Sequence, residues 1–106
     1  MPVIDVGLIF EDIETAYKFL LKYAPNAQKL WRHADYAFRY CDNLLCFTFQ
    51  KSGIEPFKGQ RYHFVFTTQD VMNSEWYRQV GAKLAAGGNK LLCRNDGTII
   101  ENRRQL

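Results

Sequence analysis

The sequence predicts a single α+β domain in which a mainly antiparallel sheet of five to six strands carries two helices packed on one face. The chain has 106 residues, of which 47% are hydrophobic and 24% charged, as is typical of one globular domain with a buried core. Two segments place apolar residues at helical spacing, and several short segments alternate aromatic with smaller or polar residues. No linker or internal repeat divides the chain, so we expect one domain over residues 1–106.

The chain is expected to open with a strand and a helix. Residues 3–10 form an apolar run interrupted only by Asp5 and Gly7, which predicts a buried strand. Asp12 is a typical helix N-cap, and Pro25 ends the helix that follows it. The apolar positions of this helix recur at three- and four-residue steps, namely Ile13, Ala16, Tyr17, Leu20 and Ala24.

Residues 26–41 fit both the residue spacing of a helix and the alternation of a strand. A helical stripe runs through Ala27, Leu30, Trp31, Ala34, Ala37, Phe38 and Cys41. Against a helix, the rings of Tyr36, Phe38 and Tyr40 alternate with other residues, and Asp42-Asn43 then makes a short polar break before residues 44–49. Such a break between two aromatic-rich runs is typical of a hairpin, so we favour a strand from about Tyr36, preceded by a short helix or an extended lead-in.

The remaining segments predict a loop, a strand, a helix and a second hairpin. Glycines and a proline mark residues 51–60 as a surface loop. Residues 61–67 alternate, with the rings of Tyr62, Phe64 and Phe66 on one face of the expected strand. Met72, Trp76, Val80 and Leu84 mark a helical face, and Gly87-Gly88 ends that helix. Asn95-Asp96-Gly97 supplies the tight turn of a final hairpin between residues 91–94 and 98–101.

The resulting order is β-α-β-β-β-α-β-β. The nearest simple architecture is ferredoxin-like with extra strands, and a curled half-barrel fits the same order. Both arrangements place the two helices over one face of the sheet.

Composition argues against several classes of protein. No apolar run is long enough to span a membrane, and no basic stretch precedes an apolar segment at the N-terminus, so we expect a cytoplasmic protein without membrane contact. Cys41, Cys46 and Cys93 form no CxxC pair or His/Cys cluster, which favours small buried hydrophobes over a disulfide framework or a zinc site. We therefore expect neither a metal nor a cofactor. The net charge of +3 is spread along the chain.

Aromatic residues are concentrated on the middle strands, at Tyr36, Phe38, Tyr40, Phe47, Phe49, Tyr62, Phe64 and Phe66. Their simplest role is to form the core beneath the helices. Two helices can leave part of such a sheet uncovered, and an uncovered strip would serve as a dimer interface or as a platform for stacking nucleic-acid bases. Arg39, Arg61 and His63 have the opposite strand parity to the rings, so nucleic-acid binding is not favoured.

The best candidate site is the corner where the strand at 61–67 meets the following helix. Strand-to-helix junctions are where many mixed α/β proteins bind ligands, although hydroxyls and a carboxylate at this position also cap helices. The candidate ligand-binding residues are Arg61, His63, Thr67, Thr68, Asp70 and Trp76.

We expect a small non-enzymatic binding domain, a homodimer, that uses its aromatic sheet surface or the strand-helix corner to hold a protein or a small molecule. One alternative is a small hydrolase- or lyase-like enzyme centred on His63 and Asp70, with the imidazole as general base. A second alternative is a module that binds single-stranded nucleic acid.

Overall fold

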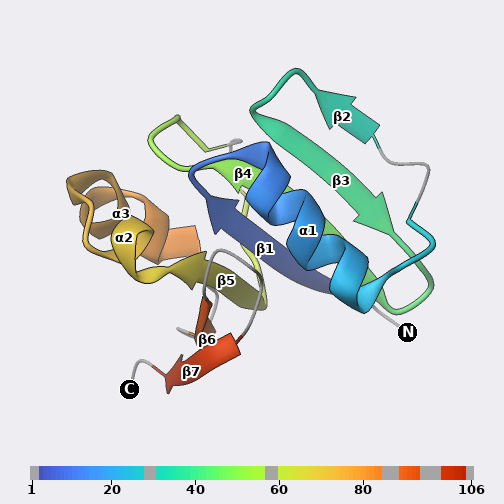
Figure 1. Ribbon diagram of the computed structural model, residues 1–106. Coiled ribbons are helices and arrows are strands. Elements are labelled where there is room, and N and C mark those ends of the chain that lie inside the picture. Colours follow the sequence, from blue (N-terminus) through green and yellow to red (C-terminus); the bar gives the residue numbers. More distant parts are fainter. Residues whose placement is uncertain (1–2, 28–30, 57–59, 85–88, 94–98, 105–106) are drawn as a thin grey trace.

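The computed structural model describes residues 3–27, 31–56, 60–84, 89–93 and 99–104, and for residues 31, 82, 89–93 and 99–104 it describes the backbone alone. The elements in chain order are β1 (Ile4–Phe10), α1 (Ile13–Tyr23), β2 (Trp31–His33), β3 (Ala37–Cys41), β4 (Leu45–Lys51), β5 (Phe64–Thr68), α2 (Gln69–Met72), α3 (Glu75–Gln79), the 3₁₀ helix η1 (Gly81–Leu84), β6 (Asn89–Cys93) and β7 (Ile99–Arg104). The strands form one sheet in the order β2-β3-β4-β1-β5-β6-β7 (Figure 1).

The sheet is mixed, so the expected mainly antiparallel sheet of five to six strands is wrong. Strand β1 pairs in parallel with both β4 and β5, and β5 pairs in parallel with β6. Antiparallel pairing is confined to the two sides, where β2, β3 and β4 follow one another and β7 adds to β6. Short turns reveal antiparallel neighbours in a sequence, whereas parallel neighbours are joined by long crossovers that leave no local turn signal.

The helices lie on opposite faces of the sheet, not together on one face as expected. Val6, Leu8 and Phe10 of β1 form one core cluster with Ala16, Phe19 and Leu20 of α1. The intervening Ile9 belongs to a second cluster with Val71, Tyr77 and Leu84 of α2, α3 and η1. Because successive side chains of a strand point to opposite faces, the two clusters lie on opposite sides of β1. Two-sided cover is typical of a sheet whose central strands are parallel.

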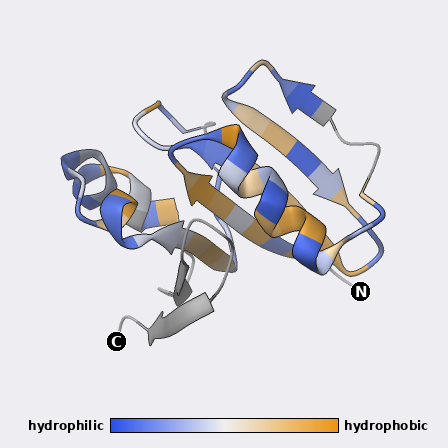
Figure 2. Ribbon diagram, in the orientation of Figure 1, coloured by the Kyte–Doolittle hydropathy of each residue, from blue (hydrophilic) through white to orange (hydrophobic). Residues whose placement is uncertain are grey.

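Helix α1 has the predicted ends and a buried face that matches the predicted stripe at Ile13, Ala16, Leu20 and Ala24 but not at Tyr17. The Asp12 carboxylate accepts a hydrogen bond from the Thr15 amide at 2.7 Å, and the helix ends at Tyr23, two residues before Pro25. Its buried residues are Ala16, Phe19 and Leu20, whereas Tyr17 is exposed. Figure 2 shows the apolar colouring of β1, beside which α1 runs.

The ambiguous segment is a hairpin, as we favoured. Strand β3 begins at Ala37 and pairs antiparallel with β4 across the Asp42-Asn43 turn. Of the two lead-ins left open, the structure shows the extended one at Trp31–His33, because β2 pairs antiparallel with β3 at the edge of the sheet. The connection between β2 and β3 includes Ala34, whose φ of 48° lies in the left-handed region.

The expected helix over residues 72–84 is broken into three short pieces. The Thr68 hydroxyl caps α2 and the Ser74 hydroxyl caps α3, and each accepts a hydrogen bond from a backbone amide. Ser74 thus begins a new helix inside the apolar stripe that we assigned to one helix. Strands β6 and β7 form the predicted final hairpin. Its Asn95-Asp96-Gly97 turn, like Gly87-Gly88, lies outside the described residues.

Tyr62 lies on the other side of the sheet from Phe64 and Phe66, contrary to the parity that we assigned. The chain bends at His63, so regular alternation begins only at Phe64. The buried Tyr62 ring packs against the backbone of Gly7 in β1, in the second cluster. A Cβ atom on Gly7 would come within 2.6 Å of the Tyr62 Cγ atom, which leaves no room for any side chain.

This contact predicts that Gly7→Ala destabilises the fold. The added methyl group would displace the Tyr62 ring, an overpacking cost of about 2–3 kcal/mol in the free energy of unfolding measured with urea. In a Tyr62→Leu background the smaller side chain should reduce this cost to less than half. An equal cost in both backgrounds would show that the ring is not what excludes a side chain at position 7.

Candidate functional site

The two threonines of the predicted corner hold the backbone together. Thr67 is fully buried, and its hydroxyl donates a hydrogen bond to the carbonyl oxygen of Ile9 at 2.7 Å. The Thr68 hydroxyl accepts from the Val71 amide at 3.3 Å as the cap of α2. Asp70 is exposed in the first turn of α2. Both threonine hydroxyls are thus engaged within the protein, as the capping interpretation of this corner requires.

His63 lies at the opposite end of β5 from Asp70. Its backbone amide donates to the carbonyl oxygen of Asp5 at 2.9 Å, and its Nδ1 accepts from the Asp5 amide at 2.9 Å. These two hydrogen bonds join the entry of β5 to the start of β1. Because the whole of β5 separates His63 from Asp70, the structure does not bring the proposed acid-base pair together.

Trp76 and Arg61 lie on the side of the sheet covered by α3 and η1. The Trp76 indole Nε1 donates to the carbonyl oxygen of Ile54 at 2.8 Å and so ties the loop after β4 to α3. Arg61 is exposed and lines an open cavity of about 350 Å³ together with Glu55, Pro56, Gln60, Val80, Lys83 and Leu84. The six sequence-predicted residues therefore form no single site.

A different site, which we call the apolar pocket, lies between α1 and the amino-terminal ends of β1, β4 and β5. It has a volume of about 300 Å³. The residues that line it are Ile4, Val6, Phe19, Tyr23, Leu45, Phe47, Phe64 and Phe66. Every one of these side chains is aliphatic or aromatic, and only Tyr23 carries a polar atom.

Three neighbouring rings, tilted against one another, form one wall of the apolar pocket. The ring centroids of Phe19 and Phe66 lie 4.6 Å apart, and those of Phe19 and Tyr23 lie 4.9 Å apart. Val6 and Phe47 are buried, whereas Ile4, Tyr23 and Phe64 are 40%, 50% and 38% exposed. The pocket therefore has a buried apolar floor and an apolar mouth at the surface.

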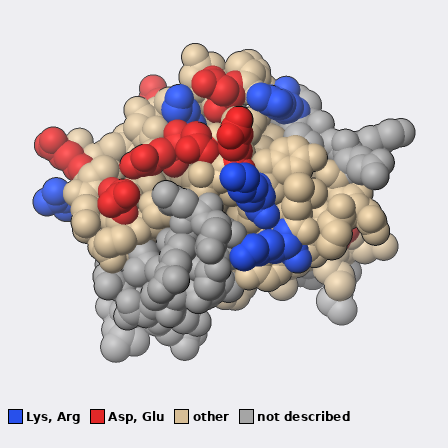
Figure 3. Space-filling model, viewed as in Figure 1, with Lys and Arg blue, Asp and Glu red and all other residues tan. Residues whose placement is uncertain are grey.

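The charge distribution separates this mouth from the acidic part of the surface. In Figure 3 acidic side chains gather at the end of the molecule that carries the start of α1 and the helices α2 and α3. The side nearer the N-terminus shows mainly uncharged side chains. The mouth lies at that side, because the amino-terminal end of β1 forms part of it.

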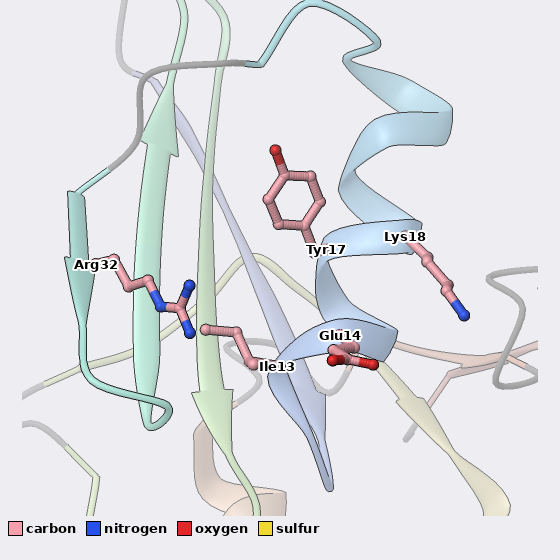
Figure 4. Close-up of a pocket in the computed structure, with 5 residues that line it drawn as sticks. All are labelled: Ile13, Glu14, Tyr17, Lys18 and Arg32. Atoms are coloured by element: carbon pink, nitrogen blue, oxygen red, sulfur yellow. The ribbon is translucent and has the colours of Figure 1, made fainter.

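A second cavity, which we call the charged cavity, lies on the other flank of α1, between its first turns and β2 (Figure 4). It also measures about 300 Å³, and its lining consists of Ile13, Glu14, Tyr17, Lys18 and Arg32. Arg32 comes from β2, and the other four residues come from α1. The Tyr17 ring meets the buried Phe38 ring edge-on, with centroids 6.4 Å apart.

Cys41 and Cys46 form a disulfide across the hairpin of β3 and β4, which differs from the expected small buried hydrophobes. The two residues are direct cross-strand partners in the observed register. The Arg39 Nε donates a hydrogen bond to the Cys46 sulfur at 3.2 Å. Disulfides are typical of oxidising compartments, so this bond does not support the expected cytoplasmic location. That location stays a prediction. The side chain of Cys93 lies outside the described part of the protein.

Two carboxyl groups have lowered pKa values for structural reasons. Backbone hydrogen bonds from Leu45 and Leu44 hold the pKa of Asp42 below its ordinary value, and a backbone hydrogen bond from Thr15 does the same for Asp12. Both act as caps of a turn or a helix. Burial raises the pKa of the Tyr62 hydroxyl well above its usual range and raises that of Tyr77 to about 12.

Within the described ranges, no helix is long and apolar enough to cross a membrane. The described residues also include no group of three or more His, Cys, Asp or Glu side chains that could hold a metal ion. Comparison of the chain with protein-family models, with curated proteins and with solved structures found no match.

The apolar pocket was not predicted from the sequence because the residues that line it come from distant segments of the chain. Phe19 and Tyr23 are four residues apart on α1, a spacing that places them on one helix face, but the assigned stripe ran through Tyr17 instead. Phe64 and Phe66 were recognised as sharing a strand face. Their proximity to α1 depends on the parallel pairing of β1 with β5, which no local pattern predicts.

The raised pKa values of the buried tyrosines predict a loss of stability at high pH. A tyrosine hydroxyl titrates near pH 10 in the unfolded chain, and the pKa of Tyr77 in the folded chain is about 12. Below about pH 10 the hydroxyl is protonated in both states, and its full contribution to the stability of the fold is present. Between about pH 10 and pH 12 the unfolded chain loses this proton first, so the folded state loses stability as the pH rises. Removing one such hydroxyl with Tyr77→Phe should make the fall in unfolding free energy above pH 10 shallower by up to about 1.4 kcal/mol per pH unit. Urea unfolding of both proteins from neutral pH to about pH 11 measures this slope, and equal alkaline slopes would contradict the assignment to Tyr77.

Proposed function

We propose that the domain is a non-enzymatic binding module that holds a small aromatic or aliphatic molecule in the apolar pocket. The observation that carries the proposal is an apolar space of about 300 Å³ that opens to the surface, within the size range of ligand sites. Among the residues that the structure describes, its lining offers no carboxylate, imidazole, thiol or ammonium group, so it suits binding and not acid-base or nucleophilic chemistry. The aromatic residues of the middle strands thus contribute both core and ligand contacts.

Neither alternative function has comparable support. The enzyme alternative requires His63 and Asp70 in one site, and they lie at opposite ends of β5. Base stacking requires exposed rings, but Phe38, Phe47, Phe49 and Tyr62 are buried. Of the eight aromatic residues that we assigned to the middle strands, Tyr36 and Phe64 are exposed, Tyr40 and Phe66 are half-buried, and the other four are buried.

Filling the apolar pocket should weaken ligand binding without unfolding the protein. Leu45 lines the pocket, and its neighbour Leu44 is 65% exposed outside it, so the same added atoms can be placed inside or outside the site. We expect indole and naphthalene to shift the methyl NMR signals of Ile4, Val6 and Leu45 in the wild-type protein. Leu45→Phe should weaken binding at least roughly tenfold through loss of apolar contact area, and Leu44→Phe should bind like wild type.

Two results would contradict this proposal. One is a wild-type protein that shows no saturable shift with any of the apolar probes. The other is a Leu45→Phe protein that binds the probes as well as Leu44→Phe does, which would place the binding outside the apolar pocket.

A second copy of the chain is a further candidate partner, because the mouth of the apolar pocket exposes three large apolar side chains. Ile4, Tyr23 and Phe64 border one opening, and contiguous apolar surface is typical of protein interfaces. We propose that two copies associate through this mouth. The homodimer would bury the rings that the single chain leaves in contact with water.

Dimerisation through the mouth predicts that Phe64→Glu gives a monomer. The carboxylate would have to be buried without a partner in the interface, which is strongly unfavourable. Tyr36 is 44% exposed and does not line the apolar pocket, so Tyr36→Glu is the matched control and should leave the dimer intact. Size-exclusion chromatography with light scattering measures the mass, and a wild-type monomer at tens of micromolar protein would rule out the dimer.

A further inference from the structure

Arg32 is held in place at the edge of the charged cavity. Its Nε donates a hydrogen bond to the carbonyl oxygen of Ala34 at 2.8 Å, within the connection that carries the left-handed φ of 48°. With Nε engaged, the terminal nitrogens of the guanidinium group remain to bind a ligand. Figure 4 shows this group turned toward Ile13, on the α1 side of the cavity.

Opposite charges line the charged cavity without pairing with each other. Among the residues with described side chains, the one ion pair within 4.0 Å joins Lys51 and Asp35, so Glu14 and Arg32 do not form one. In Figure 4 the Ile13 side chain lies between these two charges, and Lys18 points away from Arg32. The cavity therefore presents Arg32 and Glu14 on two sides of an apolar side chain, with Lys18 as a second cation on the α1 side.

The apolar part of the charged cavity is fixed by the core. Ile13 is half-buried and packs against the first core cluster. Tyr17 is held by its edge-on contact with Phe38, which is fully buried. A ligand can thus rest an apolar group on Ile13 and the Tyr17 ring.

We infer that the charged cavity binds an α-amino acid with an apolar or aromatic side chain. The ligand carboxylate accepts hydrogen bonds from the Arg32 guanidinium, and the ligand ammonium donates to the Glu14 carboxylate. The ligand side chain covers Ile13 and the Tyr17 ring. A zwitterion matches both protein charges, whereas a simple anion leaves Glu14 unpaired and a simple amine leaves Arg32 unpaired. The inference is independent of the apolar pocket and of its proposed ligand.

The test is an NMR titration of the ¹⁵N-labelled chain with L-phenylalanine, N-acetyl-L-phenylalanine and phenethylamine. The amino acid should shift the amide signals of Ile13, Tyr17 and Arg32 in a saturable way. Each analogue lacks one charge and should bind roughly tenfold more weakly, the loss of one charge-assisted hydrogen bond. Equal binding by either analogue would overturn the zwitterion assignment, and a lack of saturable shifts with L-phenylalanine would overturn the site.

Matched variants connect any binding to the named side chains. Arg32→Gln and Glu14→Gln remove one charge each and should weaken L-phenylalanine binding roughly tenfold. Arg61→Gln removes an exposed arginine that lines a different cavity and should leave binding unchanged. Leu45→Phe, which fills the apolar pocket, should also leave it unchanged. Binding lost in Leu45→Phe but kept in Arg32→Gln would overturn the inference and assign the amino acid to the apolar pocket.

Discussion

The burial of β1 on both faces is the constraint on which the rest of the structure depends. Residues 6–10 are all buried, and β1 is paired along both edges, so every side chain in this stretch must meet a covering layer. Val6, Leu8 and Phe10 meet α1, and Ile9 meets the cluster formed by α2, α3 and η1. Gly7 has no side chain and admits the Tyr62 ring instead. One strand thus determines where both helical layers and the chain before β5 must lie.

In the part of the chain that the structure describes, one helix of 11 residues, α1, covers the sheet face to which Val6, Leu8 and Phe10 point, and both cavities lie beside it. Helix α1 packs on β1 and β4 through Ala16, Phe19 and Leu20, and its last residue, Tyr23, lies beside the apolar pocket. The pocket occupies the space where β5 extends past the helix flank, and the charged cavity occupies the space toward β2. A longer or second helix on this face would fill these spaces. The candidate sites therefore lie on the two flanks of the same helix.

The sequence was informative wherever a signal was local. Asp12 and Pro25 predicted the ends of α1, and the Asp42-Asn43 turn predicted the hairpin of β3 and β4. Pairing between distant segments was not predictable, because β1 contacts β4 and β5 across long connections. The wrong parity of Tyr62 had a local cause, since the bend at His63 precedes the strand and breaks the alternation.

Because a sequence shows local patterns but not long-range pairing, the predicted corner and the observed cavities differ. Thr67, Thr68 and Asp70 are polar residues that stand together in the sequence, so they attracted a functional interpretation, but polar residues at a strand-to-helix junction are also needed to satisfy backbone groups. The cavities are formed by residues that look ordinary one at a time, such as Ile13 and Leu45. Their significance arises only from the space between them. That space depends on the parallel order of the central strands and on the length of α1, which are properties of the whole fold.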